Sequence, residues 1–498
     1  MGARIEDLQP RALWGYFAEL AKIPRASKNE AAAIAWIDKV AREHGAEARR
    51  DAVGNILVRV PATRGRERAP VVLLQSHIDM VCEKNRDVLH DFERDPIRPV
   101  IDGEWVRAQG TTLGADNGIG VAAALALLDE KQAMHGPLEL LFTIDEETGL
   151  TGASAIQPGY FTARIMINLD SEEIGVFTVG CAGGRDTTIT AKARRAARPN
   201  LELRRVAVTG LQGGHSGTDI HKNRGNSIKI LARMLLAAAE DPAVGAISIG
   251  ALVGGSKRNA IPREASATVG VAPDRAEALR AALEREASRV QAQLKGIDER
   301  MQLTIEAAPE PGCGPTSQAE ALQVCDPEDS LRLLRLLNGL PHGVLAMSVD
   351  MPNLVETSSN VGVVNDLGDG WQISCSSRSS VGPALEGVLA QVRSVARLAG
   401  AQTVHNDGYP GWKPNLKSPL LARSLEVHRK LFQQEAEVRA IHAGLECGLL
   451  TEKYPELDII SYGPDIQGAH SPDERVRIPT VEKMWSFTLA LLEDLAKS

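Results

Sequence analysis

Histidine and carboxylate residues stand just after three short apolar stretches. His77 and Asp79 follow VVLLQS, Glu146 and Glu147 follow LELLFTID, and Asp170 follows IMINL. Continuous apolar runs of this length are typical of strands in the interior of a parallel sheet. In open α/β sheets, functional side chains gather beyond the carboxyl ends of the strands. We therefore expect these five residues to lie together at one edge of a sheet.

A fourth segment adds another carboxylate. Asp116 lies in TTLGADNGIG, a glycine-flanked turn before a segment rich in alanine and leucine. Taken singly, each group has an ordinary alternative: Asp116 could cap a helix, a His-x-Asp pair usually binds no metal, and adjacent glutamates usually lie in a solvated loop. Taken together, carboxylates that share one site cannot all stay ionised. One or two divalent cations would resolve this repulsion, so the sequence predicts a metal centre.

The segments that must position these residues alternate between helical and strand-like patterns. Helical spacing covers 11–22, 30–46 and 116–130, and strand-like runs cover 56–60, 71–75, 138–144 and 165–169. The last hundred residues continue this alternation, with a helix at 418–433, a strand at 457–461 and a helix at 480–496. Such alternation predicts an α/β domain with a largely parallel sheet.

The middle of the chain has a different pattern. Strands are expected at 205–209, 246–253, 265–272, 301–306, 344–349, 361–365 and 371–376, and helices at 225–240, 274–295, 327–338 and 383–398. This order predicts an α+β region of two successive βαββαβ-like units. The region would then interrupt a discontinuous α/β domain. Periodicity alone leaves that insertion open, because it says nothing of which segments meet.

Length and composition exclude several classes of protein. A chain of 498 residues is expected to form two or three domains. A net charge of −8 argues against binding nucleic acid through its phosphates. We find no apolar run of about 18 residues that could span a membrane, and no signal-peptide pattern. The six cysteines form no C-x-x-C pair, which predicts free thiols in a reducing compartment, the cytoplasm.

The motifs together resemble those of the bacterial aminoacyl-histidine dipeptidases, also called cytosol nonspecific dipeptidases, of the dizinc aminopeptidase and deacylase clan. The resemblance rests on SHIDMVCEKN, TTLGADNGIG, FTIDEETGLTGA, NLDSEE and GPDIQGAHSPDERV. It extends nearly end to end through IPRASKNE, DAVGNILVR, GGHSG, RNAIPRE and HAGLECGLL. Any one motif is weak, whereas their shared order and spacing are specific.

The resemblance implies two zinc ions per subunit, which Co²⁺ or Mn²⁺ could replace. It assigns His77 and Asp170 to one ion, Glu147 and His470 to the other, and Asp116 to both. Mixed imidazole and carboxylate ligands suit zinc and leave positions open for water and substrate. Such a metal pair would supply a hydroxide nucleophile, polarise the scissile carbonyl and orient the substrate.

The resemblance also implies roles for residues beside the ions. Asp79 would accept the second N–H of the His77 imidazole and orient the ring. Glu146 would act as general base, taking a proton from water and passing it to the leaving amine. A cis peptide bond is implied between Asp116 and Asn117.

In the middle region, the resemblance points to residues that meet the substrate. His215, in GGHSG, would donate a hydrogen bond to the developing oxyanion, although a turn histidine is an equal alternative. Asn259 and Arg378 would grip the α-carboxylate of the substrate, although Arg378 could equally form an exposed salt bridge. His442 and Glu446 could meet the free amine or an imidazole.

The expected protein is therefore a metallo-dipeptidase with a catalytic domain of residues 1–186 and 398–498 and a lid or dimerisation domain of residues 187–397. It would hydrolyse unblocked dipeptides of broad sequence, including Xaa-His, and bind neither nucleic acid nor membrane. One alternative is an N-acyl-amino-acid deacylase of the same clan. Another is a non-catalytic dimetal binding protein, against which Glu146 argues. A homodimer is the preferred assembly, although a doubled lid could replace the partner subunit.

Overall fold

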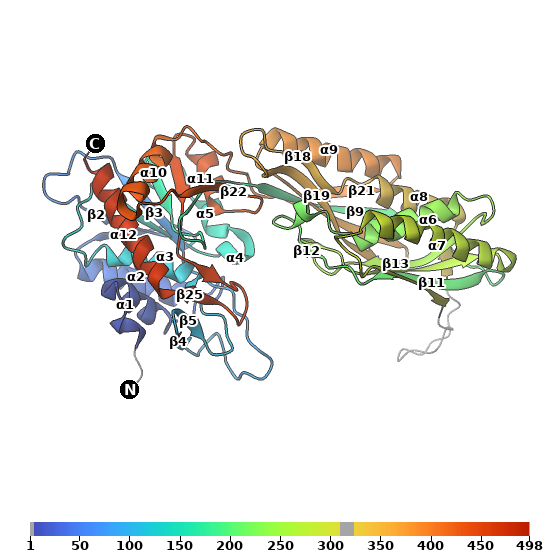
Figure 1. Cartoon of the computed structure of the whole chain (residues 1–498), viewed down its shortest axis with the longest axis horizontal. Helices are drawn as coiled ribbons and strands as arrows, with labels where there is room; N and C mark the ends of the chain where they lie inside the picture. The colour runs from blue at the N-terminus through green and yellow to red at the C-terminus, as the bar shows by residue number, and fades with distance from the viewer. Residues whose placement is uncertain (1–3, 309–322, 498) are drawn as a thin grey trace. The chain divides into compact units, whose positions relative to one another are not determined.

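The computed structural model describes residues 4–308 and 323–497, and the chain runs back and forth between two units. Unit 1 comprises Met1–Cys181, Trp412–Ala440 and Leu445–Ser498. Unit 2 comprises Ala182–Gly411 and Ile441–Gly444. Figure 1 shows that the blue N-terminal helices and the red C-terminal helices belong to the same unit.

Unit 1 contains an eight-stranded sheet. In order across the sheet, the strands are β1 (Glu47–Arg50), β2 (Ile56–Val60), β6 (Leu138–Thr143), β3 (Val72–His77), β7 (Ile165–Asn168), β23 (Asp458–Ser461), β8 (Val176–Cys181) and β22 (Glu437–Ile441). The central four, β6-β3-β7-β23, run parallel. Every residue of β3 and β6 is buried, as their continuous apolar sequences predict.

Helices and a second, smaller sheet complete unit 1. The helices are α1 (Arg11–Leu20), α2 (Ala31–Glu43), α3 (Ala115–Ala126), α4 (Glu146–Gly149), α5 (Thr151–Ala155), α10 (Pro419–Phe432), α11 (Glu446–Lys453) and α12 (Ile478–Leu495), with a 3-10 turn at Ile5–Asp7. The small sheet contains β24 (Ile466–Gln467), β25 (Arg475–Arg477), β5 (Trp105–Ala108) and β4 (Pro99–Asp102). Helix α3 is apolar on all sides and packs between α1 and β3, so it is almost wholly buried.

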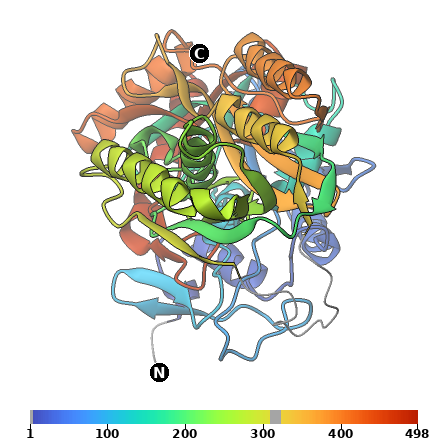
Figure 2. The same ribbon diagram turned by 90° about the vertical axis from the view of Figure 1, so that its right-hand side faces the viewer.

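Unit 2 contains a nine-stranded sheet. The order is β16 (Gln302–Ala307), β11 (Glu202–Thr209), β15 (Ala265–Val271), β13 (Ser248–Gly254), β19 (Val355–Asp366), β20 (Gly370–Ser379), β9 (Gly183–Lys192) and β21 (Gln402–His405), with β18 (Gly343–Met347) beside β19. The larger helices are α6 (Ser227–Ala239), α7 (Ala276–Gln293), α8 (Pro327–Gly339) and α9 (Gly382–Leu398). They lie along one side of the sheet, coloured green to orange in Figures 1 and 2.

Two βαββαβ repeats share this sheet, but one is nested in the other. The first is β11-α6-β13-β15-α7-β16, and the second is β9-α8-β19-β20-α9-β21. Each shows the same antiparallel strand order, fourth-first-third-second, and β13 joins them to β19. The first repeat is thus inserted between β9 and α8 of the second, whereas the sequence suggested successive repeats. The pair β10 (Arg195–Ala197) and β17 (Gln323–Cys325) flanks the insertion.

One apolar core joins both repeats of unit 2. It includes Val206 and Leu235 of the first repeat and Ile189, Leu337 and Val392 of the second. The remaining short elements of this unit are β12 (Gly214–His215), β14 (Ala260–Ile261) and the 3-10 turns Ile220–Lys222 and Pro273–Arg275. A shared core of this kind makes the stability of each repeat depend on the other.

Two sequence expectations concern the whole chain. Among the helices described, none is long and apolar enough to cross a membrane. Cys82, Cys181, Cys325, Cys375 and Cys447 are all free thiols, as predicted. Cys313 lies outside the described residues.

Asn226 links α6 to the sheet, and this generates the first prediction. Its side chain accepts a hydrogen bond from the Lys229 N–H at 3.1 Å and donates one to the Val361 carbonyl at 2.9 Å. Replacing Asn226 with Ala should lower the free energy of unfolding by about 2 kcal/mol, because it removes a helix cap and leaves a buried carbonyl unpaired. Chemical denaturation measures the loss, with the exposed Asn200→Ala as control. Equal midpoints for the two variants would contradict the prediction.

Candidate metal centre

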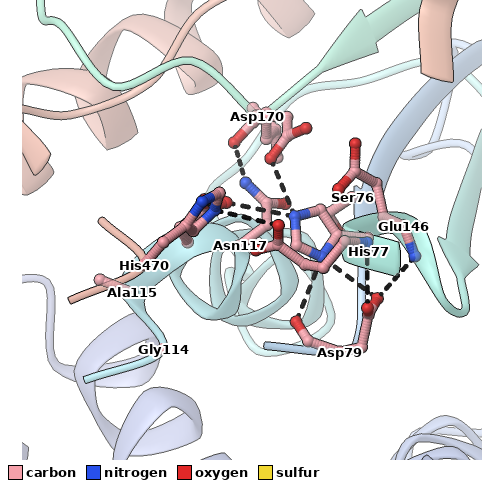
Figure 3. A network of polar contacts seen from close by, with 12 residues as sticks. Ser76, His77, Asp79, Gly114, Ala115, Asn117, Glu146, Asp170 and His470 are labelled. Atoms are coloured by element: carbon pink, nitrogen blue, oxygen red, sulfur yellow. Dashed lines mark hydrogen bonds and ion pairs between the residues drawn. The ribbon is translucent and has the colours of Figure 1, made fainter. Parts of the chain in front are cut away.

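Three of the five predicted ligands come from the carboxyl ends of parallel strands in unit 1. His77 ends β3, Glu147 lies in the turn after β6, and Asp170 follows β7. His470 lies in the loop after β24, and Asp116 lies in the first turn of α3. Figure 3 shows the side chains of His77, Asp170 and His470 directed toward one another.

Asp116 lies between two imidazoles. Its Oδ1 atom is 3.1 Å from Nε2 of His77, and its Oδ2 atom is 3.2 Å from Nε2 of His470. Asp170 Oδ1 lies 3.2 Å from Nε2 of His77, and Glu147 Oε2 lies 2.9 Å from Nε2 of His470. Two candidate ligand triads therefore share Asp116, and the ligand atoms of each triad lie within 4.8 Å of one another. The alternative in which Asp116 caps its own helix does not apply, because its carboxylate faces these imidazoles.

The charges of this group fit bound cations. Glu147 Oε1 and Asp170 Oδ1 are buried and have no hydrogen-bond partner among the described residues. Burial raises the pKa of Asp170 to about 6. Burial would lower the pKa of His77, but Asp170 and Asp116 outweigh it and raise that pKa well above its ordinary value. Hydrogen bonds to Asp116 and Glu147 raise the pKa of His470 to about 11. The carboxylates therefore raise the pKa values of both imidazoles, as an excess of negative charge does. The imidazole and carboxylate donors suit zinc.

Asp79 connects His77 to the turn that carries the two glutamates. It is fully buried, and its carboxylate accepts the N–H of Glu146 at 3.0 Å, the N–H of Glu147 at 3.2 Å and the Ser27 hydroxyl at 2.8 Å. The His77 Nδ1 atom is 3.1 Å from the Asp79 carbonyl and 3.4 Å from its carboxylate. Burial opposes ionisation, yet His77 and these hydrogen bonds lower the pKa of Asp79 to about 2. The backbone carbonyl thus takes the better hydrogen bond from the ring.

Glu146 and Glu147 reach the same site because β6 has already ended at Thr143. Asp145 adopts a left-handed backbone with φ of 49°, and α4 begins with the glutamates. A ligand atom of Glu146 lies within 4.8 Å of ligand atoms of His77 and Glu147. Burial raises the pKa of Glu146 well above its ordinary value. The peptide bond between Asp116 and Asn117 is cis, as the resemblance implied.

Four predicted residues lie in unit 2 and gather there. Strand β12, which contains His215, pairs with β14, and the Ser216 N–H donates to the Asn259 carbonyl at 2.9 Å. His442 Nε2 is 2.7 Å from the Ser358 hydroxyl, and Ser358 is paired with Arg378 in the sheet.

The Arg378 guanidinium is buried rather than exposed. It is 8% exposed, donates to the Tyr409 hydroxyl at 2.9 Å and forms no salt bridge with any residue in the described ranges, which excludes the surface-pair alternative. Burial and Arg378 lower the pKa of His442 to about 3 and also lower that of His215. Arg378 Nε, His442 Nδ1 and Ser216 Oγ are buried without partners. This cluster is short of negative charge.

Glu446 lies apart from His442. It belongs to unit 1, is fully buried, and accepts hydrogen bonds from Gln75 Nε2 and Thr143 Oγ1, each at 2.6 Å. Burial raises its pKa to about 7, and Oε1 has no partner. The two residues expected to meet one amine thus belong to different units, and both roles stay predictions.

The sequence analysis missed two buried residues around the centre, Arg25 and Glu474. Their partners are backbone groups, which leave no pattern in the sequence. The available signals were the place of Arg25 inside the motif IPRASKNE and that of Glu474 inside the late motif GPDIQGAHSPDERV, four residues after His470.

Comparisons with known proteins agree with this arrangement. Residues 73–494 match the peptidase family M20/M25/M40. The chain is 42% identical over 494 residues to the cytosol non-specific dipeptidase of Escherichia coli (strain K12), covering 99% of each. Its structure resembles aminoacylhistidine dipeptidase from Vibrio alginolyticus with a TM-score of 0.89 and 41% identity, covering 99% of this chain and 98% of the other.

A more distant structure shares the fold alone. Aminopeptidase PepT from Bacillus cereus matches with a TM-score of 0.57 at 17% identity, covering 98% of this chain and 99% of its own. The resemblance inferred from the motifs is confirmed, and the matched span contains His77, Asp116, Glu147, Asp170 and His470. With these side chains gathered at one sheet edge inside that span, the chain belongs to the peptidase family M20/M25/M40.

Proposed function

We propose that this chain is a cytoplasmic metallo-dipeptidase that hydrolyses unblocked dipeptides, Xaa-His among them. The observation that carries the proposal is the pair of ligand triads sharing Asp116, in a chain 42% identical to a protein named a dipeptidase. The free cysteines and the word cytosol in the name of that relative support the cytoplasm. The expected homodimer stays a prediction.

The proposed centre holds two zinc ions. His77 and Asp170 would hold one, Glu147 and His470 would hold the other, and Asp116 would contact both. When bound, the ions supply an activated water and polarise the scissile carbonyl. Glu146 would take a proton from the attacking water and return it to the leaving amine, and burial raises the pKa of this carboxyl. Asp79 is proposed to orient His77 through its backbone carbonyl and to hold the turn of the two glutamates through its carboxylate.

Residues of unit 2 are proposed to bind two groups of the substrate. These groups are its α-carboxylate and the oxyanion that develops from its scissile carbonyl. Arg378 has an unpartnered, buried Nε atom and no carboxylate partner in the described chain, so it is suited to the α-carboxylate of a dipeptide. Asn259 is proposed to assist it. Burial and Arg378 lower the pKa of His215, and its ring N–H is proposed to donate a hydrogen bond to the developing oxyanion.

A substrate panel with metal analysis tests the proposal. Protein purified with zinc should hold two ions per chain and hydrolyse Xaa-His dipeptides, lose activity in a chelator and recover it with added zinc. N-acetyl amino acids should be poor substrates, because they lack the free amine that a dipeptidase is proposed to contact. A deacylase needs no such contact. Faster hydrolysis of N-acetyl amino acids than of dipeptides would replace the proposal with the deacylase alternative.

Replacing Glu146 with Gln should reduce kcat by about 10²- to 10⁴-fold, because the amide cannot take a proton from water. Zinc content should stay at the wild-type value. The control Glu104→Gln removes an exposed carboxylate that pairs with Arg477 and should retain full activity. Unchanged turnover of the Glu146 variant, measured by release of free histidine, would remove the proposed general base.

Replacing Arg378 with Ala should raise KM for dipeptides by about 10- to 100-fold, because a charged hydrogen bond to the carboxylate is lost. The KM of dipeptide amides, which lack that carboxylate, should change little. Arg397→Ala, on the exposed side of α9, is the matched control. An equal rise in KM for dipeptides and for their amides would show that Arg378 does not bind the carboxylate.

A further inference from the structure

We infer that Glu474 is a positioning residue that fixes the shared carboxylate of Asp116, and that it links the His470 loop to the loop before α3. The inference rests on the proposed metal centre and extends it, because Glu474 is not among the expected ligands. Glu474 lies four residues after His470 and is 2% exposed.

The carboxylate of Glu474 is saturated by backbone donors. Its Oε2 atom accepts the N–H groups of Leu113 at 2.7 Å and Gly114 at 2.9 Å. Its Oε1 atom accepts those of Ala115 at 2.7 Å and Asp116 at 3.2 Å. Hydrogen bonds to an ionised acceptor are the strong ones. Four consecutive peptide groups, ending at Asp116 itself, are therefore held by one side chain.

The loop cannot supply this carboxylate itself. The capping position of α3 is Gly114, which has φ of 71°. A Cβ atom there would lie 2.4 Å from the Arg25 guanidinium. A side chain at 114 is thus excluded, and no side chain caps the helix locally. The orphan N–H groups that begin a helix need an acceptor, and Glu474 provides it from a distant part of the chain.

Arg25 extends the link to the third ligand loop. It is 2% exposed and donates to the carbonyls of Ile78 at 2.7 Å, Asp79 at 3.1 Å and Gly114 at 2.6 Å. The loop after β3 is in this way tied to the loop before α3. The positive charge of Arg25 also faces Glu474 and Asp79, which balances their buried carboxylates.

The strained turn at His470 leads directly into the turn that ends at Glu474. His470 has φ of 62°, a left-handed conformation that is costly for a residue with a Cβ atom. The two turns are closed by the Ser471 N–H on the Gly468 carbonyl and the Glu474 N–H on the Ser471 carbonyl, respectively. Because the Glu474 N–H closes the turn that directly follows the His470 turn and its side chain holds the Asp116 N–H, a shift at Glu474 is expected to disturb both proposed ligands.

A purely structural role as a helix cap is the competing explanation, and unit 1 offers a matched control for it. Glu139 is 3% exposed, and its Oε2 atom accepts the N–H groups of Thr162 at 2.7 Å and Ala163 at 3.0 Å. It lies in β6, and its carboxylate has no contact with the proposed ligands. Glu139→Gln therefore removes a buried carboxylate from backbone donors without touching the centre.

The experiment compares Glu474→Gln, Glu474→Asp and Glu139→Gln in the full chain. Zinc affinity is measured by chelator competition, and the coordination geometry by the visible absorption of the Co²⁺-loaded protein. Glu474→Gln should bind zinc about 10- to 100-fold more weakly and change the cobalt spectrum, because its NH₂ group would face backbone donors and release Asp116. Its kcat should fall while KM changes little. Glu474→Asp, which keeps the charge, should recover part of the affinity.

Glu139→Gln should unfold more readily yet keep wild-type zinc affinity and cobalt spectrum. Wild-type affinity and spectrum in folded Glu474→Gln would overturn the inference. Should that variant not fold, Glu474→Asp decides: an unchanged spectrum and affinity there would also overturn it. If the wild-type protein itself bound no zinc pair or cleaved no dipeptide, the proposed function would fail instead, so the two failures are distinguishable.

Discussion

Repulsion between buried carboxylates is the constraint on which the site of unit 1 depends. Asp116, Glu147 and Asp170 crowd two imidazoles at the end of a sheet whose strands are buried on both faces. The structure meets the constraint by directing backbone N–H groups at the neighbouring carboxylates of Asp79 and Glu474, while the crowded ligands keep unpartnered oxygen atoms. The supporting carboxylates are satisfied by peptide groups, and the ligands are left for cations.

Much of this arrangement follows from strand patterns. The apolar runs before His77, Glu146 and Asp170 predicted buried parallel strands, and parallel strands bring their carboxyl ends to one edge. His470 follows no such run, since it leaves the short strand β24 through a turn, and only the resemblance pointed to it. Arg25 and Glu474 lie in motifs that carry the resemblance, but their roles could not be predicted, because their partners are carbonyl and N–H groups present in every residue. The nesting of the repeats was also hidden, because periodicity does not encode strand partners.

The chain passes between the two units inside one short motif. His442 and Glu446 are four residues apart, yet the chain passes from unit 2 back to unit 1 between them. His442 joins Arg378 and Ser358, whereas Glu446 enters the buried layer beside Gln75 and Thr143. The two ends of the motif HAGLECGLL therefore lie in different environments. In unit 2, burial lowers the pKa of His442 and favours its neutral imidazole. In unit 1, burial raises the pKa of Glu446 and favours its neutral carboxyl.

The nesting of the two repeats in unit 2 also sets the order in which its strands can meet. The inserted repeat closes all of its ladders within residues 202–307. Strand β9 pairs with β20, and Gly184 lies opposite Arg378 in that ladder. This pairing cannot form until the whole insertion and β20 have been synthesised. Closing so long a loop costs entropy and slows folding. We expect the inserted repeat to form early and to offer its edge strand β13 as the template for β19. The pairing of β9 with β20 beside Arg378 is then expected to form after the inserted repeat has closed.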